Sequence, residues 1–136
     1  MSIYAVVDTN VLLSALLSKK SDTATVKIVK ALMDGKFIPL WHESIIEEYD
    51  EVFHRQKFHL RESSIQKVLT AVKFYGKYTK PIDTSDVPSD DDDVIFWQIA
   101  VAERHNDAFL VTGNIKHFPQ REFVVTPATM VTTHKW

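Results

Sequence analysis

The chain has 136 residues, of which 45% are hydrophobic and 25% are charged, and these proportions are typical of a folded domain. The absence of cysteine excludes disulfide bonds and zinc sites built on cysteine ligands. The formal net charge of -2 excludes the overall basic excess of general nucleic-acid binders. Binding of nucleic acid would therefore need a bound metal ion or local Lys and Arg residues.

The length predicts one domain across residues 1–136 with a substantial core. The first residues lack a basic segment followed by a long apolar run, so we expect no secretory signal. No apolar stretch reaches the length that a bilayer requires. We therefore expect a cytoplasmic protein that has no membrane partner.

Strand and helix patterns alternate along the chain, which predicts an α/β fold around a mainly parallel sheet. Short apolar runs predict strands, and apolar residues at helical spacing predict helices. The expected elements are a strand at 3–7, helices at 11–17 and 24–34, a strand at 37–40, helices at 44–53 and 64–78, a polar loop at 81–92, a helix at 94–104, and strands at 109–112 and 123–125.

The first strand ends directly in a carboxylate, Asp8. Ligands of open parallel sheets bind just beyond the carboxyl ends of the strands. Asp8 is therefore either a site residue or the cap of the following helix. The next residues, Thr9 and Asn10, can cap that helix or support Asp8, since both residue types are favoured at helix starts.

The helix expected at 44–53 has one apolar face and turns most of its acidic residues away from it. Glu48 lies at the border of that face, nearest the core among these acidic residues. Because burying a charge is costly, Glu48 is either compensated within a site or an edge residue whose carboxylate reaches water.

Four consecutive aspartates, Asp90 to Asp93, precede a helix that is apolar almost all round. The N-terminal end of a helix favours acidic residues, so a solvated helix start explains this run. The helix itself is expected to be buried, however, and its N-terminus then points to a definite place in the fold. Asp93 is in phase with Ala100 and close to the phase of Trp97, both candidate core residues.

The strand at 109–112 ends in Thr112-Gly113-Asn114. A turn of this composition is common in α/β proteins, but here it can meet the end of the first strand. Asp8, Glu48, Asp93 and Asn114 could then share one pocket. Oxygen ligands without cysteine suit Mg²⁺ or Mn²⁺, ions that activate water in phosphodiester hydrolysis.

In order and spacing, these segments resemble the PIN domain family, and within it the toxin-like branch of bacterial and archaeal toxin-antitoxin systems. The resemblance covers nearly the whole chain. It rests on Val7-Asp8-Thr9-Asn10-Val11, on Ser44 to Val52 with Arg55-Gln56-Lys57-Phe58, on Asp92-Asp93 with Ala100-Val101-Ala102, and on Leu110 to Pro119.

The resemblance implies a three-layer α/β/α PIN-like fold with a mainly parallel central sheet. It also implies a ribonuclease that uses Mg²⁺ or Mn²⁺ to hydrolyse phosphodiester bonds of single-stranded RNA, as the toxin of a toxin-antitoxin system. The partners it implies are single-stranded RNA, a cognate antitoxin protein and a second copy of the chain in a homodimer.

Residue by residue, the resemblance assigns the catalytic and metal-binding carboxylates to Asp8, Glu48 and Asp93, with Asp92 as the alternative to Asp93. Asn114 stands at a position that is often aspartate in the family, and we expect it to reach the metal through a water molecule. Related sequences often carry an acid three residues later, where this chain has His117. The residues expected to contact substrate or support the carboxylates are Thr9, Asn10 and Thr112.

Two other functions fit the same residues. A phosphatase of the haloacid-dehalogenase type would use Asp8 as its nucleophile, but that family has a second aspartate where this chain has Asn10. The main alternative is a non-catalytic PIN-like module that binds RNA or a protein, because Asn114 brings no charge to the site.

Overall fold

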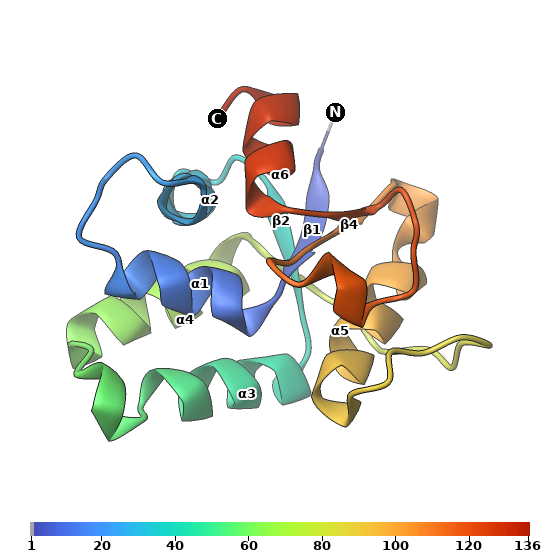
Figure 1. Cartoon of the computed structure of the whole chain (residues 1–136), viewed down its shortest axis with the longest axis horizontal. Helices are drawn as coiled ribbons and strands as arrows, with labels where there is room; N and C mark the ends of the chain where they lie inside the picture. Colours follow the sequence, from blue (N-terminus) through green and yellow to red (C-terminus); the bar gives the residue numbers. More distant parts are fainter. Residues whose placement is uncertain (1) are drawn as a thin grey trace.

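The computed structural model describes residues 2–136, and within this range five parallel strands form one sheet in the order β3-β2-β1-β4-β5 (Figure 1). The strands are β1 (Tyr4–Val7), β2 (Ile38–Trp41), β3 (Lys77–Tyr78), β4 (Phe109–Val111) and β5 (Val124–Val125). The helices are α1 (Thr9–Leu17), α2 (Ala24–Met33), α3 (Glu43–Phe53), α4 (Glu62–Tyr75), α5 (Asp91–Ala102) and α6 (Pro127–His134). Three 3₁₀ turns complete this part of the chain: η1 (Gln56–Phe58), η2 (Arg104–Asn106) and η3 (Ile115–His117).

Helices cover both faces of the sheet. α5 packs on β1 and β4, while α1, α2, α4 and α6 lie on the other side, and α3 passes below the carboxyl ends of the strands (Figure 1). This arrangement confirms the predicted three-layer α/β/α fold with its parallel sheet. Among the described residues, no helix combines the length and apolar character needed to cross a membrane.

The core forms around β1, the middle strand of the sheet. Ala5 and Val6 are fully buried because helices cover both faces of the strand. α5 is apolar on nearly all sides, and its Trp97 is also tied to the preceding loop: the indole N–H donates to the carbonyl of Asp86 at 2.8 Å. Burying a side chain of this size stabilises the fold by roughly 1.5–3 kcal/mol. The start of α5 is therefore fixed relative to the sheet.

The predicted C-terminal boundary of the helix at 64–78 is wrong, because α4 ends at Tyr75 and β3 follows at Lys77–Tyr78. The cause lies at Gly76, where a Cβ would be 2.1 Å from the carbonyl oxygen of Val72 and 2.5 Å from that of Pro39. The chain therefore passes β2 at a distance that only glycine allows. Tyr78 then packs edge-on against Trp41, with ring centroids 5.0 Å apart.

Other predicted boundaries also differ from the structure. α1 begins at Thr9 rather than at residue 11, and α5 begins at Asp91 rather than at residue 94, inside the segment predicted as a loop. α6 was not among the predicted elements. Its start carries a recognisable signal, because the hydroxyl of Thr126 accepts the N–H of Thr129 at 3.1 Å and Pro127 occupies the first turn.

The substitution Gly76→Ala should lower the free energy of unfolding by about 3 kcal/mol, because the added methyl group meets rigid backbone carbonyls. Gly113→Ala is the matched control, since a Cβ there meets nothing within 4 Å in the described part of the chain. Urea unfolding of both variants measures the difference. Equal stability of the two variants would contradict the close approach of β2 and Gly76.

Candidate active site

A cleft of about 410 Å³ opens where the carboxyl ends of β1 and β4 meet α3 and α5. Segments far apart in the sequence contribute to its walls, which include the carboxylates of Asp8, Glu48, Asp90, Asp92 and Asp93. The other residues from the sequence prediction that line it are Thr9, Asn10 and Asn114. Arg55, Lys57 and His117 also face this cleft. These predicted residues thus lie at one cleft, whereas Thr112, also predicted, does not line it and is fully buried.

Asp8 lies at the base of the cleft and is only 5% exposed. Its Oδ2 accepts a hydrogen bond from the hydroxyl of Thr112 at 2.7 Å, and that hydroxyl in turn accepts the backbone N–H of Asn114 at 3.0 Å. Burial raises the pKa of Asp8, and the bond from Thr112 offsets only part of this effect. The backbone N–H groups of Thr9 and Asn10, at the start of α1, also lower the pKa of Asp8. The carboxylate therefore lies between the hydroxyl of Thr112, just after β4, and the N-terminus of α1.

Glu48 reaches the same cleft from the middle of α3. The hydroxyl of Thr9 donates a hydrogen bond to Glu48 Oε2, so Thr9 supports a carboxylate instead of capping α1. Burial raises the pKa of Glu48, and the charges of Asp8, Asp92 and Asp93 raise it further against the bond from Thr9. The carboxylate predicted at the border of the apolar face thus points toward other acids and not into open solvent.

Tyr49 lies on the apolar face of α3, the helix predicted at 44–53, and it sets the position of that helix. Its ring is 1% exposed, and its hydroxyl donates to the carbonyl of Val7, the last residue of β1. Burial raises the pKa of Tyr49 well above its usual range, and the charges of Asp8 and Glu48 add to the effect. The neutral phenol therefore joins α3 to the strand that carries Asp8. The helical spacing of Tyr49 predicted its burial but not the backbone carbonyl that accepts its hydrogen bond.

Asp93 lies in the first turn of α5, behind the cap that Asp90 forms by accepting the N–H of Asp92 at 3.0 Å. Asp93 Oδ2 is buried and has no hydrogen-bond partner among residues 2–136; Nδ1 of His117 is 3.8 Å away. Burial, followed by the charge of Asp8, raises the pKa of Asp93 from 3.8 to about 6. Asp92, the alternative ligand from the sequence, is exposed.

Asn10 and Asn114 are both exposed at the rim of the cleft. Asn114 contributes to the site through its backbone, since its N–H fixes the hydroxyl of Thr112 and its carbonyl accepts the N–H of His117 at 2.9 Å. This second bond shapes the η3 turn. The turn then forms a wall between the cleft and its surroundings.

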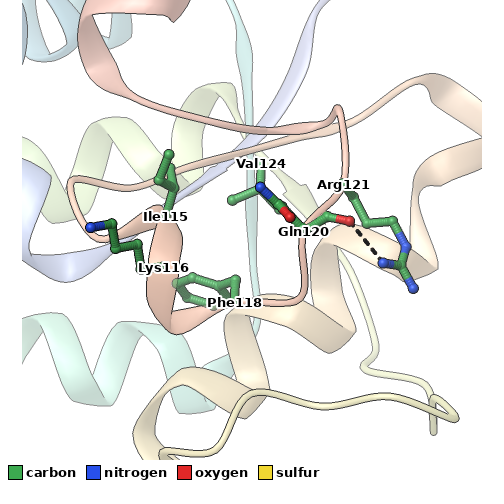
Figure 2. A pocket seen from close by; sticks show the side chains of 6 residues that line it. All are labelled: Ile115, Lys116, Phe118, Gln120, Arg121 and Val124. Atoms are coloured by element: carbon green, nitrogen blue, oxygen red, sulfur yellow. Dashed lines mark hydrogen bonds between the residues drawn. The ribbon is translucent and has the colours of Figure 1, made fainter.

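A second hollow of about 390 Å³ lies on the other side of the η3 turn, where no sequence motif predicted one. Figure 2 shows its lining: Ile115, Lys116, Phe118, Gln120, Arg121 and Val124. The cleft and the hollow share one turn, because Asn114 and His117 face the first while Ile115 and Lys116 face the second.

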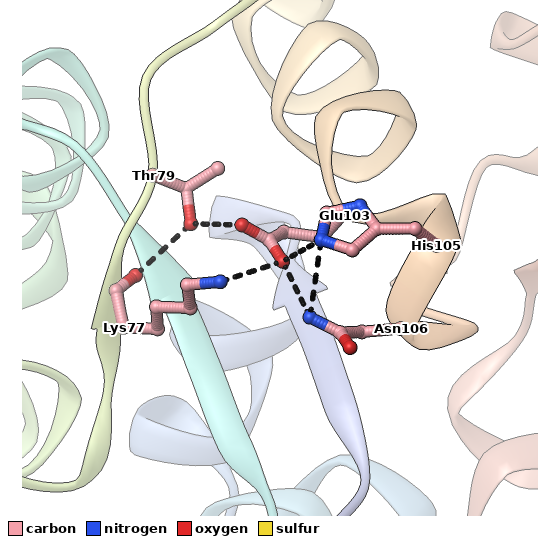
Figure 3. A network of polar contacts seen from close by, with 5 residues as sticks. All are labelled: Lys77, Thr79, Glu103, His105 and Asn106. Atoms are coloured by element: carbon pink, nitrogen blue, oxygen red, sulfur yellow. Dashed lines mark hydrogen bonds and ion pairs between the residues drawn. The ribbon is translucent and has the colours of Figure 1, made fainter.

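The opposite end of α5 carries a buried carboxylate with a different environment. Glu103 accepts bonds from Lys77 Nζ at 3.0 Å, Asn106 Nδ2 at 2.9 Å and Thr79 Oγ1 at 3.4 Å, while His105 Nε2 lies 3.6 Å away (Figure 3). Burial alone would raise the pKa of Glu103, but these partners hold it below its usual range. Because these partners compensate its charge, Glu103 is a structural residue. The acids of the cleft differ, since their partners do not offset the rise in their pKa values.

The cleft residues fit a hard divalent cation in the chemical type of their donor atoms. Their donors are carboxylate oxygens, the pKa values of Asp8, Glu48 and Asp93 are all raised, and one buried oxygen of Asp93 lacks a partner within the described chain. As placed, no three His, Cys, Asp or Glu side chains of residues 2–136 are close enough to hold an ion. Mg²⁺ commonly takes one or two carboxylates and completes its shell with water, so a closed cage is not required.

Together, the parallel sheet and the acidic cleft at its carboxyl edge define an α/β protein with a candidate hydrolytic site. Among models of protein families, the PIN domain matches residues 4–116. This match covers most of the chain, so the chain belongs to the PIN domain family. PIN domains are generally nucleases and typically use divalent metal ions. A search of curated proteins found no match.

The charge cluster predicts a pH dependence for the metal-free protein. Between pH 3.8 and about 6, Asp93 binds more proton in the folded state than in the unfolded state, because its folded pKa is the higher one. The free energy of unfolding should therefore fall as the pH rises through this window. Urea unfolding in the presence of a chelator measures the effect.

Asp93→Asn isolates the contribution of this carboxyl group. The variant should gain stability relative to the parent as the pH rises from about 4 to about 6. If the difference in free energy of unfolding between the two proteins stays constant over this range, Asp93 ionises at no cost in stability. That result would contradict its placement among like charges.

Proposed function

We propose that this chain is a Mg²⁺- or Mn²⁺-dependent endoribonuclease that hydrolyses phosphodiester bonds of single-stranded RNA. The observation that carries the proposal is the gathering of Asp8, Glu48 and Asp93 at one cleft, with a buried oxygen of Asp93 left without a partner among residues 2–136. Uncompensated carboxylates with raised pKa values cluster at functional sites. Membership of a family of nucleases supports the same conclusion.

In this proposal Asp8, Glu48 and Asp93 hold the ion. The chemistry that the ion supplies when bound is activation of an attacking water and stabilisation of charge on the leaving oxygen. Thr112 and Thr9 each bond one oxygen of a carboxylate, Asp8 and Glu48 respectively, which fixes the carboxylate and leaves its other oxygen for a ligand. Asn114 offers an amide carbonyl at the rim, suited to accept a hydrogen bond from a water molecule.

The toxin role is proposed from the resemblance of the motifs to the toxin-like branch of the family. Its partners would be a cognate antitoxin protein and a second copy of the chain in a homodimer. Induced expression of the chain should then arrest bacterial growth, and coexpression of the antitoxin should restore it. Growth arrest by the parent but not by Asp8→Asn is the expected result. Equal growth with either protein would contradict the toxin role and leave the nuclease proposal standing.

Asp8→Asn should reduce RNA cleavage by more than about a hundredfold, because it removes the central charge of the site. The asparagine oxygen still accepts the bond from Thr112, so the fold should survive. Cleavage of a labelled single-stranded RNA with added Mg²⁺ or Mn²⁺ measures the effect, and Asp22→Asn is the control at an exposed loop carboxylate. Full activity of purified Asp8→Asn would refute the catalytic role.

The non-catalytic module stays the second candidate, since Asn114 is neutral and the described carboxylates form no closed metal cluster. The same assay separates the two functions. RNA binding without cleavage in either metal would favour the module, whereas cleavage that a chelator abolishes would favour the nuclease.

Asn114→Asp tests whether position 114 belongs to the metal site. Without metal, the added charge repels Asp8, Glu48 and Asp93 and should lower the melting temperature by about 3 °C, the shift expected for roughly 1 kcal/mol in a chain of this size. With Mg²⁺ or Mn²⁺, the same charge should strengthen ion binding and reverse the loss by mass action. Thermal melting over a metal titration measures both effects. Identical curves for the variant and the parent would place Asn114 outside the site.

A further inference from the structure

The cleft and its proposed substrate carry the same sign of charge. Among residues 2–136, five carboxylates line the cleft together with the cations of Arg55 and Lys57. A phosphodiester strand is therefore repelled wherever no cation meets it. Affinity of a protein for a nucleic-acid backbone comes mainly from Lys and Arg contacts to phosphates. The basic residues nearest the cleft therefore decide how a strand can lie across it.

On one side, the cations come from η1 and the residue before it. Arg55 is already engaged, because its Nη2 and Nε donate to Glu51 at 2.9 and 3.2 Å. Its bonds to Glu51 raise the pKa of Arg55, and the charges of Glu51, Glu48 and Asp92 add to this effect. Lys57 forms no salt bridge within residues 2–136, is exposed, and holds its ammonium 5.2 Å from the centroid of the Phe58 ring. Lys57 is thus the cation at this side that is available to a phosphate.

On the other side, the cations are Lys116, within η3, and Arg121, and both line the second hollow (Figure 2). Arg121 is engaged there too, since it donates to the Asp86 carboxylate and to the carbonyl of Gln120 at 2.8 Å. Lys116 lines the hollow, is exposed, and has no salt-bridge partner in the described chain. Lys116 is therefore the second available cation, on the far side of the turn that walls the cleft.

The second hollow also has features that suit a nucleobase. Ile115, Phe118 and Val124 give it an apolar surface, and the amide of Gln120 offers a donor and an acceptor. Its volume of about 390 Å³ falls within the usual range of ligand pockets. Ile115 is 44% exposed, so its side chain is accessible to a flat apolar ligand.

We propose that single-stranded RNA lies across the cleft from η1 to η3, with Lys57 and Lys116 each holding a phosphate on opposite sides of the bond to be cleaved. The nucleobase beside Lys116 occupies the second hollow, against Ile115. In Figure 1, η1 lies between α3 and α4 while η3 lies beside α5, so the two turns lie at opposite ends of such a path. This inference rests on the proposed nuclease function and adds the route of the substrate.

Fluorescence anisotropy with a labelled oligouridine tests the path on the Asp8→Asn background, where cleavage does not interfere. Lys57→Ala and Lys116→Ala should each weaken binding by about tenfold, the loss of one charge-assisted contact. Each should also lower the slope of log affinity against log salt by about 0.7. The control is Lys36→Ala. Lys36 is exposed and lies just before β2, at the amino ends of the strands and therefore away from the cleft.

An abasic strand of the same length separates the two kinds of contact. Both lysine variants should weaken the abasic strand and oligouridine equally, because phosphates are common to both. Ile115→Ala should weaken only the strand that carries bases. In the cleaving parent, Lys57→Ala and Lys116→Ala should raise KM about tenfold and leave kcat unchanged, as expected for uniform binding.

The outcomes distinguish the path from the proposed function. If the parent binds and cleaves RNA while both lysine variants behave like Lys36→Ala, the path is wrong and the nuclease stands. If Ile115→Ala weakens both strands equally, the base does not occupy the second hollow. If the parent neither binds nor cleaves single-stranded RNA, the proposed function and the path both fail.

Discussion

The structure depends on the burial of one carboxylate, that of Asp8, which is almost inaccessible to water. β1 is the middle strand of the sheet, and the residue that follows it, Asp8, is nearly as buried as the strand itself. Such a group is tolerated only when its oxygens have partners. The pairing of Val7 with Val111 brings Thr112 beside Asp8, and its hydroxyl supplies one partner. The parallel register of β1 and β4 is therefore also what orients the base of the cleft.

The same principle positions the other wall of the cleft. Tyr49 uses the last carbonyl of β1 as its acceptor, and Thr9 turns its hydroxyl to Glu48. Both contacts join α3 to the segment on either side of Asp8. α3 is thereby attached to the sheet through polar groups as well as through its apolar face, so Glu48 has a defined place beside Asp8.

α5 carries acidic groups at both ends, and their environments differ in a way that separates structure from function. Glu103 is surrounded by donors from β3 and η2, which hold its pKa down. Asp93 has burial and like charges around it, and its pKa is raised. A carboxylate that stabilises the fold acquires partners, because a buried charge without them costs free energy. An uncompensated one is the kind of group that a bound cation would stabilise.

The sequence alone determined the fold class, since alternating apolar runs of strand and helix period leave few architectures other than a parallel α/β sheet. It also selected Asp8, Glu48 and Asp93 as candidate site residues, because helical phase and strand ends are local properties, but it gave no sign of the buried Glu103. Only the tertiary structure decided the rest. The end of α4 depends on how closely Gly76 passes the carbonyl of Pro39. The hydroxyl of Tyr49 donates to a carbonyl 42 residues away in the chain. The hydroxyls of Thr9 and Thr112 donate to carboxylates on other segments. These contacts join residues that are distant in the chain, and no local pattern specifies which of the available polar groups will meet once the sheet has formed.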